Sequence, residues 1–72
     1  MVLGKNVKKF REGKGWSQRD LANSAQISQP FISAIENDSK DVTSKVLKKL
    51  ALALGVSITE LIGDEFTPTG TE

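Results

Sequence analysis

The sequence contains no cysteine, no histidine and no tyrosine. Without cysteine there is no disulfide, no thiol nucleophile and no thiolate ligand for zinc. Without histidine, the commonest general base in enzymes is missing. The sequence also has no glycine-rich loop of the kind that cradles phosphates. We therefore expect a protein that is not an enzyme and that uses no cofactor and no metal ion.

Long apolar runs are missing as well. No stretch approaches the roughly 20 apolar residues that span a bilayer, and the N-terminal sequence MVLGKNVKKF lacks the apolar block of a signal peptide. These absences favour a cytoplasmic protein with no membrane partner. At 72 residues the chain has the size of one small domain, and such a domain buries only about 60% of the surface that its unfolded chain exposes.

The net charge of +1 hides a gradient along the chain. Residues 1–19 carry six basic residues and one acidic residue, whereas residues 60–72 carry four acidic residues and no basic one. A basic N-terminal part is compatible with a polyanionic partner. A solvated charged face is the simpler explanation, so charge alone does not decide the function.

Apolar residues recur at helical spacing along most of the chain. Leu3, Val7 and Phe10 predict a helix over 3–12 that ends at the following glycines. Four further helix starts share one pattern. In each, an apolar residue precedes a Ser or Thr N-cap, and a second apolar residue follows four positions after the cap. This pattern predicts helices over 17–24, 28–36, 43–54 and 57–62, with N-caps at Ser17, Ser28, Thr43 and Ser57.

These helices predict an all-α fold, a compact five-helix bundle within a domain over residues 1–64. Residues 65–72 have no periodicity, and we expect them to form a disordered tail or a linker. Pro30 fits the first turn of its helix, where the missing N–H costs no hydrogen bond. Because proline disfavours helical geometry in the preceding residue, two arrangements remain open. Either Ser28 is the cap and Pro30 is the second helical residue, or Gln29 is itself non-helical.

Residues 17–36 predict two short helices joined by a tight turn, as in a helix-turn-helix. The segment SQRDLANSAQISQPFISAIEN resembles the helix-turn-helix of the phage-repressor-like (lambda repressor-like, Xre) family of bacterial DNA-binding regulators. The later LALALGVSITELIG resembles the fourth and fifth helices of that family, so that the resemblance covers about residues 3–63.

Two positions depart from the family pattern. Gln26 occupies the turn position that usually carries glycine, and a left-handed backbone there would cost about 1 kcal/mol relative to glycine. Asp38 stands where the family commonly has glycine after the third helix. We expect Asn37 to adopt the left-handed cap conformation instead.

The resemblance implies that the third helix lies in the DNA major groove with its first residues at the base edges. Gln29 is then the leading base reader, because its amide can pair with adenine N6 and N7. Ser33, one turn later, can bind a base or a phosphate. Ala34 and Phe31 can touch a thymine methyl group, although packing of Phe31 against the fourth helix is an equal alternative.

The resemblance also implies which residues contact the DNA backbone and which residues fix the recognition helix in place. Gln18, with the N–H groups at the start of the second helix, is placed to bind a phosphate. Further candidates for phosphate contacts are Arg19, Asn37, Lys40 and Lys45. Arg11 and Glu36 are expected to form a structural ion pair between the first helix and the end of the third.

The resemblance therefore implies sequence-specific binding of double-stranded DNA and regulation of transcription, with repression as the expected form. A homodimer that reads an inverted-repeat operator is the natural assembly, because one subunit makes few base contacts. The fifth helix and Phe66 are candidates for its interface, with the division of Ile58, Leu61 and Ile62 between core and interface left open. The alternatives are a protein-interaction module on the same fold and an antitoxin or restriction-controller protein.

Overall fold

The computed structural model describes residues 3–39 and 42–63, and within these ranges it contains five α-helices and no strand. The helices are α1 (Leu3–Gly13), α2 (Gln18–Ala25), α3 (Gln29–Glu36), α4 (Ser44–Leu54) and α5 (Ile58–Ile62). The predicted all-α class and all five helices are confirmed, with boundaries within one residue of those expected. The predicted tail at 65–72, together with Phe66 and Lys40, lies outside the described residues.

The four predicted N-caps set the starts of α2 to α5. Each Ser or Thr side chain accepts a hydrogen bond from the backbone N–H three residues later, at 3.0–3.3 Å. At Ser17 and Ser57 an acidic side chain returns a bond to the cap N–H and completes a capping box. Ser28 is the cap of α3, with Gln29 first and Pro30 second in the helix, so the first of the two open arrangements is the correct one.

Every helix contributes to one core. The largest fully buried side chains are Val7, Leu21, Ile32, Ile35, Leu50 and Leu61. Phe10, Leu47 and Ile62, which the helical pattern placed inward, are only half-buried at the edge of this core. None of the helices in the described part of the chain is both long and apolar enough to cross a membrane.

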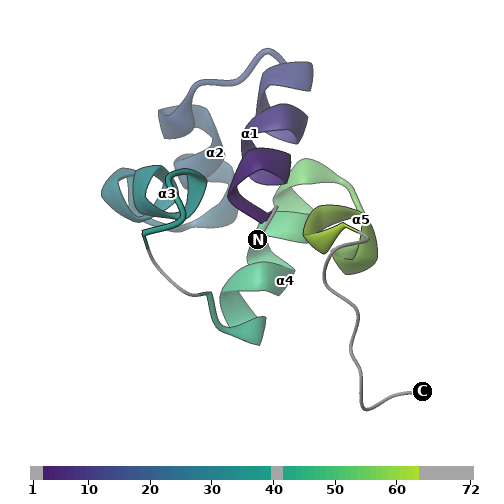
Figure 1. The fold of residues 1–72 in the computed structure, drawn as a ribbon. Coiled ribbons are helices and arrows are strands. Elements are labelled where there is room, and N and C mark those ends of the chain that lie inside the picture. Colours follow the sequence, from purple (N-terminus) through teal and green to yellow (C-terminus); the bar gives the residue numbers. More distant parts are fainter. Residues whose placement is uncertain (1–2, 40–41, 64–72) are drawn as a thin grey trace, which may run out of the picture.

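α2 and α3 lie side by side on one side of the molecule. Figure 1 shows α5 on the opposite side, with α1 and α4 between. α1 packs against α3, α4 and α5, while α2 packs against α3 and α4. The Asn6 side chain donates a hydrogen bond to the Leu61 carbonyl at 2.9 Å and ties α1 to the last turn of α5. The helix-turn-helix pair therefore rests on a scaffold made by the other three helices.

Within residues 3–39 and 42–63, two non-glycine residues adopt the left-handed conformation. Gln26 ends α2 with φ 58° and ψ 46°, as the departure from the family pattern suggested. After α3 the left-handed residue is Asp38, with φ 58°, whereas Asn37 has φ −93° and ψ 4°. The expectation for Asn37 is therefore wrong. The turn keeps its backbone geometry at the position where the family has glycine, and Asp, like Asn, tolerates this geometry through its short polar side chain.

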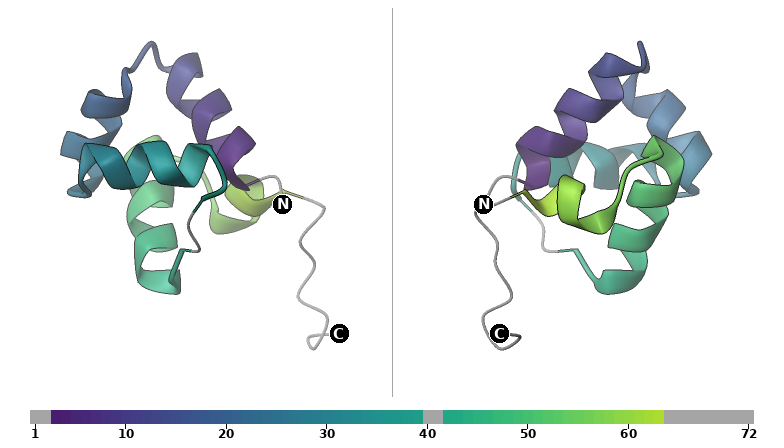
Figure 2. Two further views of the ribbon diagram at one scale, coloured as in Figure 1. Left: turned by 60° about the vertical axis from the view of Figure 1, so that its left-hand side comes forward. Right: turned by 90° about the vertical axis from the view of Figure 1, so that its right-hand side faces the viewer.

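At Gly4, α1 closely approaches the end of α3. The left view of Figure 2 shows the end of α3 meeting the beginning of α1. A Cβ atom at Gly4 would overlap with the Ile35 carbonyl oxygen and would lie 2.8 Å from the Asp38 carboxylate and 3.0 Å from the Glu36 carbonyl oxygen. The backbone of Gly4 is helical, so its conformation does not require glycine. Glycine is required at this position because a Cβ atom would have no room.

We expect Gln26→Gly to raise the free energy of unfolding by about 1 kcal/mol, because glycine adopts φ > 0 without steric cost. For a domain of this size the melting temperature should rise by about 4–8 °C. Thermal unfolding followed by circular dichroism measures the change. Asn23→Gly is the matched control, because Asn23 is also exposed but lies inside α2; this variant should be less stable. A lower melting temperature for Gln26→Gly would show that the left-handed backbone of Gln26 is not strained.

Gly4→Ala should destabilise the domain by about 1–3 kcal/mol, the usual cost of inserting a methyl group where there is no room. Gly13→Ala is the control, because Gly13 is also in α1 and a Cβ atom there meets nothing within 4 Å. Urea unfolding should show a loss of stability for the first variant and no loss for the second. Equal stability of the two variants would show that α1 and α3 do not approach as described.

Candidate nucleic-acid interface

A buried ion pair fixes the recognition-helix candidate α3 to α1. Arg11 Nε lies 2.7 Å from Glu36 Oε2, and Arg11 Nη2 lies 3.0 Å from Glu36 Oε1. The two side chains are only 9% and 4% exposed. A third bond, from Arg11 Nη1 to the Trp16 carbonyl at 2.7 Å, ties the same guanidinium to the loop before α2. The expected pair is thus present, and it joins three parts of the chain.

The surroundings of Arg11 favour its charged form. The hydrogen bond to Glu36 raises the pKa of the guanidinium above its ordinary value, burial opposes this, and the charges of Glu36 and Glu12 add to the increase. A group whose pKa is raised on folding contributes its stability at every pH below its ordinary pKa. The Arg11 contribution therefore persists across the pH range in which proteins are handled.

Gln18 belongs to the same network. Its Nε2 donates a hydrogen bond to Glu36 Oε1 at 3.1 Å, and the side chain is half-buried. An amide nitrogen carries two N–H groups, so one remains for a partner outside the domain. The first N–H groups of an α-helix, here those of Gln18 and Arg19, have no acceptor within the helix. Because Glu36 restrains the Gln18 side chain, these donors are held together at the start of α2.

The outward face of α3 is uncharged. Successive residues turn by about 100° around a helix, so the buried Ile32 and Ile35 direct Pro30 away from the core. Gln29 and Pro30 are exposed, and the other outward side chains of α3 are half-buried: Phe31, Ser33 and Ala34. The acidic residue of α3, Glu36, faces Arg11 instead. Selectivity on this face would come from amide, hydroxyl and apolar groups.

Pro30 is the residue of this face that the sequence analysis missed. Its position in the first turn of α3 was interpreted only as a signal for the helix start, and the direction of its side chain was not considered. The signal was available, because Pro30 lies two positions before the core residue Ile32, and residues two apart in a helix point in different directions.

The described candidates for phosphate contacts lie in α2, in α4 and at the end of α3. Arg19 is exposed in the first turn of α2, and Lys45 is exposed in the first turn of α4. Asn37 is exposed at the end of α3. The structure brings together Gln18, Arg11 and Glu36 by direct bonds, whereas in the described part of the chain neither Arg19 nor Lys45 forms a hydrogen bond or ion pair with them. Lys40 lies outside the described residues.

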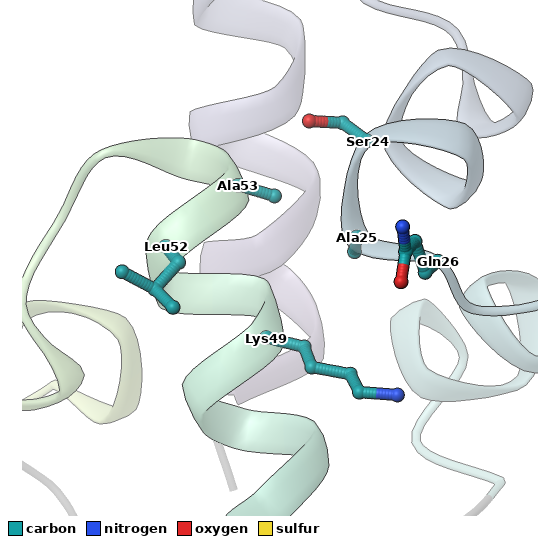
Figure 3. Close-up of a pocket in the computed structure, with 6 residues that line it drawn as sticks. All are labelled: Ser24, Ala25, Gln26, Lys49, Leu52 and Ala53. Atoms are coloured by element: carbon teal, nitrogen blue, oxygen red, sulfur yellow. The ribbon is translucent and has the colours of Figure 1, made fainter.

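A separate hollow of about 320 Å³ lies between the carboxyl end of α2 and α4. It is lined by Ser24, Ala25, Gln26, Lys49, Leu52 and Ala53. Figure 3 shows Lys49 extending toward Gln26, while Leu52, which is 83% exposed, points away from α2. Since Gln18 and Arg19 lie at the amino end of α2, this hollow is not part of the candidate interface.

Comparison with known proteins identifies the class to which this arrangement belongs. The helix-turn-helix family HTH_3 matches residues 7–61. An uncharacterized HTH-type transcriptional regulator, y4dJ of Sinorhizobium fredii, is 38% identical over 72 residues, which cover 97% of this chain and 92% of that protein. A hypothetical transcription factor of Neisseria meningitidis is 36% identical over 61 residues, which cover 85% of this chain but 58% of that protein.

A solved structure agrees with these matches. The N-terminal DNA-binding domain of SinR from Bacillus subtilis superposes with a TM-score of 0.82 at 27% identity, covering 92% of this chain and 97% of that one. The chain belongs to the helix-turn-helix family of phage-repressor-like (Xre) transcriptional regulators. It spans little more than half the length of the Neisseria relative.

Loss of either partner of the buried ion pair should be costly. We expect Arg11→Met and Glu36→Leu each to lower the free energy of unfolding by about 3–5 kcal/mol, because each leaves a buried charge unpaired. The double variant should lose clearly less than the sum of the two. Urea unfolding of the four proteins of this cycle measures the coupling.

Lys8 and Glu12 supply a control cycle, because both are exposed and lie four residues apart on α1. Coupling between such exposed helical pairs is about 0.3–0.5 kcal/mol. If the coupling of Arg11 with Glu36 is no larger than this, the buried pair does not fix α3.

Proposed function

We propose that this chain binds double-stranded DNA sequence-specifically, with α3 in the major groove, and thereby regulates transcription, most simply by repression. The observation that carries the proposal is the placement of α3. A short helix, fixed to α1 and α2 by the bonds of Glu36, presents an uncharged face with Gln29 exposed in its first turn. The major groove admits such a helix, and the SinR domain to which the chain is similar is a DNA-binding domain.

Gln29 is the proposed reader of a base edge. Its side chain is exposed, and an amide can form two hydrogen bonds with adenine N6 and N7. Ser33 follows four residues later on the same side of α3 and can bind the next base or a phosphate. Neither residue carries a charge, so their contribution should be to selectivity more than to overall affinity.

The proposed phosphate contacts surround this helix. The start of α2 offers the Gln18 side chain, the Arg19 side chain and two backbone N–H groups. Asn37, Lys40 and Lys45 would hold the backbone beyond the other end of α3. Such contacts position the helix but carry no sequence information directly.

A homodimer is part of the proposal, because one subunit supplies few base contacts. Two subunits related by a two-fold axis would read half-sites about one helical turn apart, and the operator would be an inverted repeat. Leu61 is fully buried and belongs to the core, whereas Ile58 and Ile62 are half-buried. The exposed parts of these two isoleucines on α5 are therefore the candidates for subunit contact.

The direct test is selection of bound sites from a random duplex DNA pool at about 0.1 M salt, where non-specific attraction is partly screened. We expect enrichment of an inverted repeat. Gln29→Ala should then weaken binding to the selected site by about 1–3 kcal/mol and leave binding to unrelated duplex unchanged. Thr59→Ala, an exposed change on α5, should alter neither.

Salt dependence gives a second readout of the same complex. If Arg19, Lys40 and Lys45 of both subunits contact phosphates, the logarithm of the affinity should fall with the logarithm of the salt concentration with a slope of roughly −5. Selection that enriches no sequence, together with binding that Gln29→Ala does not affect, would contradict the proposed function.

A further inference from the structure

The outer face of α4 carries three lysines and one leucine. The four residues follow one another at helical spacings of three, one and three positions, so they lie on one side of the helix: Lys45, Lys48, Lys49 and Leu52. All four are exposed, and Leu52 is 83% exposed although it is a large apolar residue. Within the described residues, none of the four packs in the core cluster. We call these four residues the lysine–leucine face.

The lysine–leucine face is unfavourable as a surface on its own. Lys45 stands three residues before Lys48 and four before Lys49, and like charges at these spacings repel each other on a helix. The sequence of α4, SKVLKKLALAL, contains no acidic residue that could offset this repulsion. Beside the lysines, Leu52 exposes its hydrocarbon side chain. A segment that combines negative charge with an apolar side chain would relieve both conditions.

The orientation of this face limits what can reach it. Figure 3 shows Lys49 extending toward Gln26, while Leu52 points away from α2. Lys48 lies one turn before Leu52 and is directed away from α2 as well, because successive residues turn by about 100° around a helix. α5 packs against α4 and lies on the opposite side of the molecule from α2 (Figure 1). Lys48 and Leu52 are therefore directed to the side on which residues 64–72 follow α5.

The sequence of residues 64–72, DEFTPTGTE, has the complementary chemistry. It contains three acidic residues, no basic residue and one large apolar residue, Phe66. A chain extends by at most about 3.6 Å per residue, so Phe66 can reach about 10 Å from Gly63 and the whole segment about 30 Å. The 11 residues of α4 are only about 16 Å long. The segment is therefore long enough to cover the lysine–leucine face.

We propose that residues 64–72 of this chain dock on the lysine–leucine face, with Phe66 against Leu52 and the acidic side chains beside the lysines. Two other occupants fit less well. A second copy meeting this face across a two-fold axis would place lysines against lysines, and a DNA backbone would leave Leu52 without an apolar partner. Lys45 is among the proposed phosphate contacts, so the docked segment would compete with DNA. This last consequence rests on the proposed function.

NMR of the full 72-residue chain tests the docking without DNA. We expect NOEs between the ring protons of Phe66 and the methyl protons of Leu52. Phe66→Ser should remove them and shift the amide signals of Lys48 and Leu52. Thr69→Ser is the matched control, because it alters the same segment but keeps both the charge and the phenyl ring, and it should leave the α4 signals unchanged.

Two results of this experiment would overturn the proposal. One is the absence of these NOEs together with unchanged α4 signals in Phe66→Ser. The other is NOEs that arise only between differently labelled copies in a mixed sample, which would make a second copy the occupant.

DNA affinity gives the readout of competition. Phe66→Ser and Leu52→Ser keep the net charge, so they release the segment without changing the long-range attraction to DNA. If about half to nine-tenths of the molecules hold the segment docked, the affinity for the selected duplex should rise about two- to tenfold in both variants. Thr69→Ser should leave it unchanged. Unchanged affinity in Phe66→Ser and Leu52→Ser would overturn the competition, whereas absence of DNA binding in every protein would overturn the proposed function and leave the docking to the NOEs.

Discussion

The position of α3 depends on one buried carboxylate. Glu36 accepts two hydrogen bonds from Arg11 of α1 and one from Gln18 of α2, so three helices meet at a single side chain. Buried charges are expensive, and such a pair adds little stability over well-packed apolar residues. Its geometry is more restrictive, however, because a bidentate pair requires a defined orientation of both groups. The pair therefore serves mainly to orient α3, in a domain whose small core leaves few other means of doing so.

The same carboxylate connects the fold to the proposed DNA contacts. Pairing with Arg11 keeps the acidic charge of α3 away from the surface that would face phosphates. Its bond to Gln18 restrains the donor group at the start of α2. The outward face of α3 is then free of charge, so the proposal assigns the attraction to DNA to Arg19, Lys45 and the helix ends. In the proposed complex, affinity would come from the edge of the interface and selectivity from its centre.

Much of the fold could be predicted from the sequence because its signals are local. A Ser or Thr cap acts on an N–H group three residues away, and the helix starts are correct for this reason. The features that were missed join distant parts of the chain. Gly4 is needed because the end of α3 approaches it, and Asn6 binds a carbonyl 55 residues later. No local pattern marks either residue.

The candidate site shows the same limit. The ion pair and the role of Gln26 followed from the family resemblance together with backbone chemistry. The left-handed residue after α3 was misplaced by one position, since Asn and Asp are both able to adopt that conformation. The outward direction of Pro30 became clear only when the core face of α3 was fixed by Ile32 and Ile35.

The most direct test of the central claim is to map the bound surface by NMR. The 15N-labelled chain is titrated with its selected duplex, and changes in the backbone amide signals are followed. The account predicts the largest changes at the starts of α2 and α3, at Gln18, Arg19, Gln29 and Phe31, with α5 affected only where subunits meet. Changes confined to α4 and α5, with the first turn of α3 unaffected, would contradict it and favour a protein-interaction surface.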